Sequence, residues 1–223
     1  NNVEDTISLI DDKTCAVMLE AVQGEGGVLP LQKEYVRKVC EYCNRHDVLV
    51  IFDEVQTGIG RTGKFFAYQN FDVLPDIVSS AKGLGGGLPI GASLVSEKCA
   101  DVLTPGTHGT TFGANPVVCA GADYVLGKID DAFLEDVIKK GDYIKSRLAA
   151  MEGIAEVRGI GMMIGAVATN NDAKDIANRA LENGLLILTA KSLLRLLPPL
   201  NISYIELNKG LDILTKTLKE MHS

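Results

Sequence analysis

The sequence lacks any long hydrophobic run and any excess of positive charge. No apolar stretch in the 223 residues approaches the ~18 to 20 residues that a membrane-spanning helix needs. Lysine and arginine together number 22, against 29 aspartate and glutamate residues, which gives a net charge of −7. This balance repels phosphate backbones and anionic membrane surfaces, so neither nucleic acid nor a membrane is an expected partner. The hydrophobic content of 46% is ordinary for a folded, soluble protein.

The arrangement of the cysteines argues against disulfide bonds. The five cysteines are an odd number at irregular spacing, which indicates free thiols in a reducing compartment, and we expect a cytoplasmic protein. Cys40 and Cys43 form a C-x-x-C pair, a pattern that redox and zinc sites share. The spacing of the surrounding apolar residues places both thiols on the apolar side of a helix, and no second pair completes a tetrahedral site. We therefore expect no bound metal.

Two further absences concern the start of the chain and its linkers. The sequence opens with Asn1-Asn2, without methionine or a leader segment, so either the start is processed or upstream residues are absent. No Pro- or Ser-rich linker, internal repeat or low-complexity tract marks a boundary. The order of the expected elements alone indicates two parts, residues 1–128 and residues 129–223.

Short apolar runs alternate with amphipathic segments in the first part. Runs without alternation are typical of strands covered on both faces, which favours an α/β fold with a mostly parallel sheet. The expected strands are 15–19, 48–52, 77–80 and 90–95, and the expected helices are 31–45 and 117–126. The second part predicts a smaller α+β unit, with helices 132–151 and 173–183 and a last one from 204, and strands 155–158, 162–168, 185–188 and 193–197.

The segment Gly58–Gly63 satisfies the dinucleotide-binding pattern G-x-G-x-x-G. In that motif the glycines follow the strand directly, whereas here five residues intervene, and Asp53 and Glu54 would repel a pyrophosphate. The same segment imitates a phosphate-binding P-loop, but Phe65 stands where a hydroxyl must ligate magnesium. A nicotinamide oxidoreductase is the weaker alternative that this segment leaves open.

Two charged residues follow neighbouring strands of the expected sheet. Asp53 ends the strand 48–52, at the edge where α/β proteins bind ligands, although a loop-anchoring role is equally compatible. Lys82 follows the strand 77–80 and precedes four glycines in five residues, which permit close backbone approach to a ligand. Partial desolvation would lower the pKa of the Lys82 amine and make it nucleophilic toward aldehydes. Taken alone, Lys82 is better explained as a surface residue whose aliphatic stem lies along the protein.

In combination these segments resemble the class III pyridoxal-phosphate (PLP) aminotransferases. The motifs that carry the resemblance are Phe52–Gly63, Pro75–Ile77, Ala81–Ala92, His108–Gly113 and Leu194–Leu200, in the family's order. The resemblance implies the PLP-dependent transferase fold of type I, with residues 1–128 as the C-terminal part of the PLP-binding large domain and residues 129–223 as the small α+β domain. It also implies a homodimer with shared active sites.

The resemblance assigns roles in cofactor binding. Lys82 would bond to the aldehyde of PLP and later carry a proton between the substrate α-carbon and the cofactor C4′. Asp53 would pair with the pyridine nitrogen and keep it protonated. Its neighbours Glu54, Val55 and Gln56 would complete the pyridine side of the site, Val55 by packing on the ring and Gln56 by a hydrogen bond to the phenolic oxygen. Thr111 would bind the cofactor phosphate of the neighbouring subunit.

Substrate contacts are implied at four residues. Arg195 lies inside an apolar strand, so by itself it either points out at a sheet edge or pairs with a carboxylate. By resemblance Arg195 binds a substrate carboxylate, Glu25 pairs with it when that carboxylate is absent, and Thr110 and Glu20 lie nearby. The motifs are most similar to members that move the amino group of N2-acetylornithine to 2-oxoglutarate in arginine biosynthesis. Ornithine, succinylornithine and other ω-amines remain alternatives.

Departures from the family pattern concern mainly the front of the chain. Glu20-Ala21-Val22-Gln23 replaces the usual Glu-Pro-Ile-Gln, and Ala114 replaces a common glycine. The family's upstream loop for the phosphate, and an aromatic residue stacked on the pyridine ring, have no counterpart in the sequence. We therefore expect the chain to be the C-terminal portion of such an enzyme, with a non-catalytic fragment as the alternative.

Overall fold

The computed structural model describes residues 1–222, and these form two compact units. The first unit consists of Asn1–Ala21, Leu31–Gly60 and Lys64–Phe133. The second consists of Val22–Pro30, Arg61–Gly63 and the chain from Leu134 onward. Two short segments from the first half of the sequence thus belong to the second unit. None of the helices within residues 1–222 is both long and apolar enough to cross a membrane.

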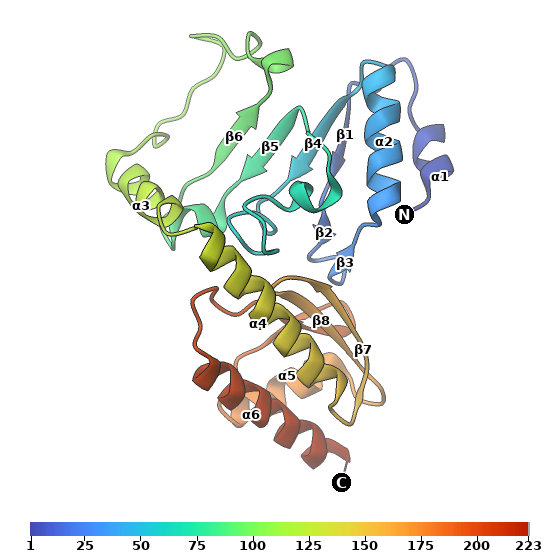
Figure 1. The fold of residues 1–223 in the computed structure, drawn as a ribbon, viewed down its shortest axis with the longest axis vertical. Helices are drawn as coiled ribbons and strands as arrows, with labels where there is room; N and C mark the ends of the chain where they lie inside the picture. Colours follow the sequence, from blue (N-terminus) through green and yellow to red (C-terminus); the bar gives the residue numbers. More distant parts are fainter. Residues whose placement is uncertain (223) are drawn as a thin grey trace. The chain divides into compact units, whose positions relative to one another are not determined.

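The first unit is built on a four-stranded mixed sheet of order β1-β4-β5-β6 (Figure 1). Its strands are β1 (Ala16–Leu19), β4 (Leu49–Asp53), β5 (Ile77–Ser80) and β6 (Ala92–Val95). The pairs β1/β4 and β4/β5 are parallel, and β6 runs antiparallel to β5. The predicted α/β architecture with a mostly parallel sheet is therefore confirmed.

Helix α2 (Lys33–Arg45) packs against β4 (Figure 1). Its buried side includes both Cys40 and Cys43, as the spacing predicts, and burial raises the pKa of the Cys40 thiol to about 12. The remaining helical segments of the unit are α1 (Val3–Ser8), η1 (Ala67–Phe71), η2 (Lys82–Gly85), η3 (Glu97–Cys99) and α3 (Pro116–Leu126).

The expectation that both faces of the sheet are covered is wrong for the described residues. Phe52 and Val78 are register partners on the buried face, where the Phe52 ring contacts Tyr68 of η1. The neighbouring pair Asp53 and Ser79 lies on the other face and is only half-buried. All four residues of β6 are exposed. Helix α2 and η1 share one side of the sheet, so the apolar run in β6 has no described helix packed over it.

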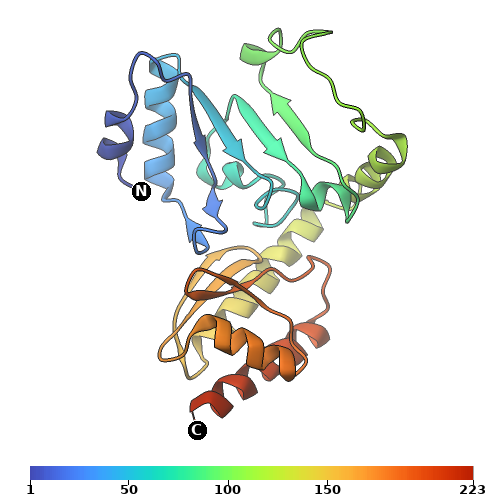
Figure 2. The ribbon, with the colours of Figure 1, turned by 180° about the vertical axis from the view of Figure 1, so that it is seen from behind.

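The second unit contains an antiparallel sheet of order β7-β8-β10-β9 (Figure 2). Its strands are β7 (Ile154–Ile160), β8 (Met163–Ala168), β9 (Leu188–Ala190) and β10 (Leu193–Leu196), and its helices are α4 (Asp131–Ala149), α5 (Ala173–Glu182) and α6 (Tyr204–His222). Helix α5 contacts β9, β10 and α6. The small α+β architecture that the sequence predicts is present.

A hairpin from the early sequence completes the core of this second unit. It consists of β2 (Val22–Gln23) and β3 (Leu29–Pro30). Val22 and Val28 are fully buried against Met163 and Leu193 of the antiparallel sheet. Gly165 permits this approach, because a Cβ there would lie 3.0 Å from the Cβ of Val28.

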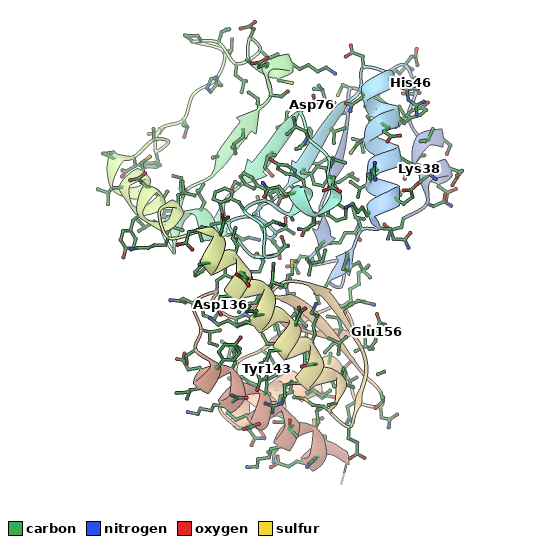
Figure 3. The ribbon with its side chains drawn as sticks, in the orientation of Figure 1. Lys38, His46, Asp76, Asp136, Tyr143 and Glu156 are labelled. Atoms are coloured by element: carbon green, nitrogen blue, oxygen red, sulfur yellow. The ribbon has the colours of Figure 1, made fainter. Side chains whose placement is uncertain are left out.

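Helices α4 and α6 are joined by a polar network around Tyr143, which projects from α4 (Figure 3). The Tyr143 hydroxyl donates to Asn208, and Arg147 donates to the same Asn208 oxygen at 2.7 Å. Arg147 also pairs with Asp212 at 2.7 Å. This network fixes the rotation of the two helices against each other within the unit.

Candidate active site

The carboxyl ends of three neighbouring parallel strands carry charged side chains. Glu20 follows β1, Asp53 ends β4, and Lys82 follows β5 after one intervening residue. Because parallel strands end at the same edge of a sheet, this edge gathers two carboxylates and an amine. The sequence predicted this juxtaposition for Asp53 and Lys82.

The Asp53 carboxylate is held by one of its two oxygens. Its Oδ1 accepts hydrogen bonds from the Val55 amide and the Ser79 hydroxyl, both at 3.0 Å. No described residue donates to Oδ2. Asp53 therefore presents one unpartnered carboxylate oxygen from a half-buried position.

The Glu54 side chain points into the core, whereas the side chain of the preceding Asp53 is partly exposed to solvent. Glu54 is completely buried, and its carboxylate accepts hydrogen bonds from the Thr57 hydroxyl at 2.6 Å and from the Ala67 and Tyr68 amides at 2.9 and 2.8 Å. Desolvation raises the pKa of Glu54, and these hydrogen bonds oppose the rise. Glu54 thus fastens the turn that contains half-buried Val55 and Gln56 to the η1 segment.

Lys82 stands at the start of η2 with a backbone φ of +48°. A non-glycine residue in this left-handed region is uncommon and often occurs where a side chain must point in a particular direction. The Lys82 side chain is exposed, and no described residue forms a hydrogen bond or ion pair with its amine. Lys82 thus lies at the surface, as the sequence favours for this residue taken alone, because β5 ends two residues earlier and no described element covers the turn.

Thr110 and Thr111 lie in the exposed segment between η3 and α3. The Thr110 hydroxyl accepts a hydrogen bond from the Gly113 amide at 3.2 Å, which shapes a local turn. Thr111 is exposed, and no hydrogen bond from its side chain to a described residue is present. Within the first unit, the two threonines are thus available to a molecule outside this segment.

Arg195 and Glu25 are brought together in the second unit. Arg195 lies on β10, between β8 and β9, so it does not point out from a sheet edge. Its side chain is 10% exposed, and Nη1 pairs with the Glu25 carboxylate at 2.5 Å. The Arg195 Nε–H is buried without a hydrogen-bond partner among the described residues. The guanidinium therefore keeps one unused N–H donor, and the carboxylate with which it pairs is exposed.

Arg61, which the sequence reasoning did not single out, holds the end of the Arg195 strand. Its Nη1 donates to the carbonyl of Met162 at 3.1 Å and to that of Pro198 at 2.7 Å. These residues lie just beyond the paired ends of β8 and β10, where the Leu196–Ile164 pairing stops. Pro198 has no N–H with which to continue the ladder, and the guanidinium replaces that donor. The signal in the sequence is the proline pair that follows β10.

Ser79 is the second functional candidate that sequence reasoning missed. Its only signal is a pair of serines that interrupts the apolar strand shortly before Lys82. A hydroxyl in a strand has many possible roles, so that signal acquires meaning only from the contact with Asp53.

The residues of the first unit fit the cofactor that the sequence resemblance implies. A pyridinium N–H needs a carboxylate oxygen without another donor, and Asp53 Oδ2 meets that requirement. An aldehyde needs an amine that is free of a carboxylate partner, as Lys82 is among the described residues. By contrast, the Gly58–Gly63 segment leads to no α-helix whose N-terminus would bind a pyrophosphate; the next helical segment is η1.

Comparison with known proteins agrees with this site. The model of the class III aminotransferase family matches residues 1–218. An acetylornithine aminotransferase of Haemophilus ducreyi is 49% identical over 208 residues, 93% of this chain and 53% of the relative. Another, of Caldanaerobacter subterraneus, is 45% identical over 227 residues, 99% of this chain and 58% of the relative. The chain thus spans somewhat more than half the length of these relatives.

Solved structures give the same result. The N-acetylornithine aminotransferase of Stenotrophomonas maltophilia has a TM-score of 0.90 at 36% identity, over 98% of this chain and 60% of its own. The ornithine δ-aminotransferase of Plasmodium falciparum has a TM-score of 0.86 at 35% identity, over 98% of this chain and 60% of its own. The fold is that of the type I PLP-dependent transferases, and the chain belongs to the class III aminotransferase family.

Proposed function

We propose that the natural protein carrying this sequence is a PLP-dependent aminotransferase that moves the amino group of N2-acetylornithine to 2-oxoglutarate in the cytoplasm. The observation that carries the proposal is the pairing of a half-free carboxylate, Asp53, with an unpartnered amine, Lys82, at the ends of adjacent strands. Residues 1–128 serve as part of the cofactor-binding domain and residues 129–223 as the small domain. Thr111 contributes to the cofactor phosphate site of a second subunit in a homodimer.

When bound, PLP supplies an aldehyde that captures amines and a ring that accepts electron density. Asp53 would accept the pyridine N–H through Oδ2 and, by its negative charge, would keep that nitrogen protonated. Val55 would pack against the ring, and Gln56 would donate to the phenolic oxygen. Lys82 would hold the cofactor through its aldehyde. Once the substrate amine displaces it, the Lys82 amine would move a proton off the carbon that carries the transferred amino group, which is Cδ in N2-acetylornithine and Cα in glutamate.

Arg195 serves the substrate carboxylate. Its buried Nε–H has no partner, and Glu25 occupies Nη1 from an exposed position. A substrate carboxylate satisfies the planar guanidinium through two parallel hydrogen bonds, which the single bond to Glu25 does not achieve. Glu25 therefore yields when a dicarboxylic substrate such as glutamate enters and pairs with Arg195 again when it leaves. Glu20 and Thr110 of the first unit are proposed as further substrate contacts.

The choice of N2-acetylornithine is supported by relatives of that activity at 44 to 49% identity. Ornithine aminotransferases among the solved structures are 32 to 35% identical over almost the whole chain. Ornithine is therefore the second candidate amino donor, and the two substrates differ by an acyl group that cancels the charge of the α-amine.

The test is a PLP titration of the natural protein, followed by transamination assays with N2-acetylornithine and with ornithine. We expect a visible absorption band for bound PLP, loss of that band in Lys82→Ala, and higher kcat/KM for N2-acetylornithine. A band that survives Lys82→Ala would contradict the assignment of Lys82. Preference for ornithine would overturn the substrate, and absence of any band in the wild-type protein would favour a non-catalytic protein instead.

A further inference from the structure

Ser79 is placed directly beside Asp53 by the pairing of β4 with β5. The two residues are register partners in a parallel pair, so their side chains leave the sheet on the same face. Both are half-buried. The Ser79 hydroxyl lies 3.0 Å from Asp53 Oδ1 and donates to it. The Ser79 carbonyl also accepts the Glu54 amide at 2.9 Å, so the backbone on both sides of this contact is fixed.

The hydrogen bond matters because an aspartate carboxylate can rotate about its last bond. One donor, the Val55 amide, comes from the turn that follows β4, and the other, the Ser79 hydroxyl, comes from the neighbouring strand. Two donors from separate elements converge on Oδ1 and prevent the carboxylate from exchanging its two oxygens. Oδ2, which no described residue contacts, is thereby held in one direction.

From this geometry we infer that Ser79 is a positioning residue for the cofactor: it fixes Asp53 so that Oδ2 alone meets the pyridine N–H. The inference rests on the proposed function. It gives Ser79 a role in cofactor binding, whereas the sequence motifs assign no role to this residue. Ser79 itself does not contact the reacting atoms. Its role is to remove the rotational freedom of the charged group that does, because a freely rotating carboxylate binds a directional donor less tightly.

The neighbouring Ser80 provides a matched control on the same strand. It is 3% exposed, and its hydroxyl is buried without a hydrogen-bond partner among the described residues. Ser80 points to the opposite face from Ser79, since side chains alternate along a strand. Ser80→Ala therefore removes an identical hydroxyl from the same strand without touching Asp53.

The test compares wild-type natural protein with Ser79→Ala, Ser79→Thr and Ser80→Ala. It measures PLP affinity by absorbance titration and the 15N chemical shift of the bound pyridine nitrogen. We expect Ser79→Ala to bind PLP about tenfold more weakly, as befits the loss of a hydrogen bond to a charged group. The 15N signal of the pyridine nitrogen in Ser79→Ala should move toward the value of a deprotonated pyridine. Ser79→Thr, which keeps the hydroxyl, and Ser80→Ala remain like the wild type.

The inference is overturned if Ser79→Ala matches the wild type in both measurements, or if Ser80→Ala loses as much affinity as Ser79→Ala. If Ser79→Ala proves less stable in thermal unfolding, Ser79→Cys, which keeps nearly the same volume but donates weakly, takes its place with the same expectation. A wild-type protein that binds no PLP would overturn the proposed function together with this inference. Normal wild-type binding with an unaffected alanine variant would overturn the inference alone.

Discussion

Glu54 shows how two adjacent acidic residues acquire different roles from their surroundings. Asp53 faces the half-covered side of the sheet, whereas Glu54 is completely buried and accepts three hydrogen bonds. The sequence resemblance assigns both residues to the cofactor site. The contacts made by Glu54 are those of a residue that fastens the turn after β4, and Asp53 is the one with an oxygen to offer.

Replacement of Glu54 by glutamine should lower the free energy of unfolding at neutral pH by about 1 to 3 kcal/mol. Both oxygens of the Glu54 carboxylate accept hydrogen bonds. Glutamine replaces one of these oxygens with an NH₂ group, so at least one buried donor would lose its acceptor. Urea unfolding of the purified chain measures the change. Thr57→Val, which removes one of the three donors and leaves the carboxylate, should cost less, and an equal cost would contradict this account.

The same residue predicts a pH dependence. Burial raises the pKa of Glu54 above its ordinary value of 4.5, so folding favours the protonated form. The stability that the proton contributes is fully present below that value and is lost as pH rises through the raised pKa of the folded state. Unfolding free energies measured from pH 4 upward should therefore fall with rising pH in the wild type relative to Glu54→Gln. A difference that is constant with pH would refute the assignment.

The placement of Asp53 and Lys82 could be predicted from the sequence because each stands at the end of an expected strand, and neighbouring parallel strands end at one edge. Ser79 could not, because its role depends on the register of two strands that are 26 residues apart in sequence. For Lys82 taken alone the sequence favours an exposed surface position, but the degree of its exposure could not be predicted. It depends on what covers the turn after β5, which the composition of the strand does not reveal.

At the scale of elements, most helices and strands lie within a few residues of the predicted ranges because their apolar periodicity is strong. The strand expected at 185–188 is instead β9, Leu188–Ala190. The Gly184 and Leu185 amides still bond to carbonyls of α5, so the helix end extends into the predicted strand. The β2–β3 hairpin was missed because each strand is only two residues long.

Helix α4 approaches the β7–β8 turn so closely that a side chain at Gly141 would collide with the turn. A Cβ on Gly141 would lie 2.2 Å from the carbonyl oxygen of Gly161. Gly141→Ala should therefore destabilise the chain by about 1 to 3 kcal/mol, as overpacking does. Gly210→Ala in α6 is the matched control, because its Cβ would meet only Leu185 at an ordinary 3.5 Å.

The control should raise stability by about 0.5 to 1 kcal/mol, the usual gain of alanine over glycine inside a helix. Thermal unfolding of both variants separates the two effects. Equal changes in the two variants would show that helix propensity and not the close approach governs Gly141.

At the scale of the whole molecule, the proposed homodimer makes each site depend on two subunits, with Lys82 from one and Thr111 from the other. Lys82→Ala and Thr111→Val should each be nearly inactive alone. Mixed after unfolding and refolding together, they should recover about a quarter of wild-type activity, because half of the dimers are mixed and each has one intact site. No recovery, in a mixture that sedimentation shows to be dimeric, would place Thr111 in its own subunit's site.

The assignment of Val22–Pro30 and Arg61–Gly63 to the second unit affects how the chain is made. The antiparallel sheet reaches the ribosome exit long after these segments, yet Val22, Val28 and Arg61 complete its core and its strand ends. Until then the early hairpin has no partner, and its apolar side chains stay accessible to chaperones and to premature association. A fragment that begins at Leu134 would lack the hairpin, and Met163 and Leu193 of its antiparallel sheet would be exposed to solvent. The order in which these segments are synthesised therefore differs from the order in which they pack. Aggregation during expression should be sensitive to substitutions in the hairpin, although the hairpin contains few residues.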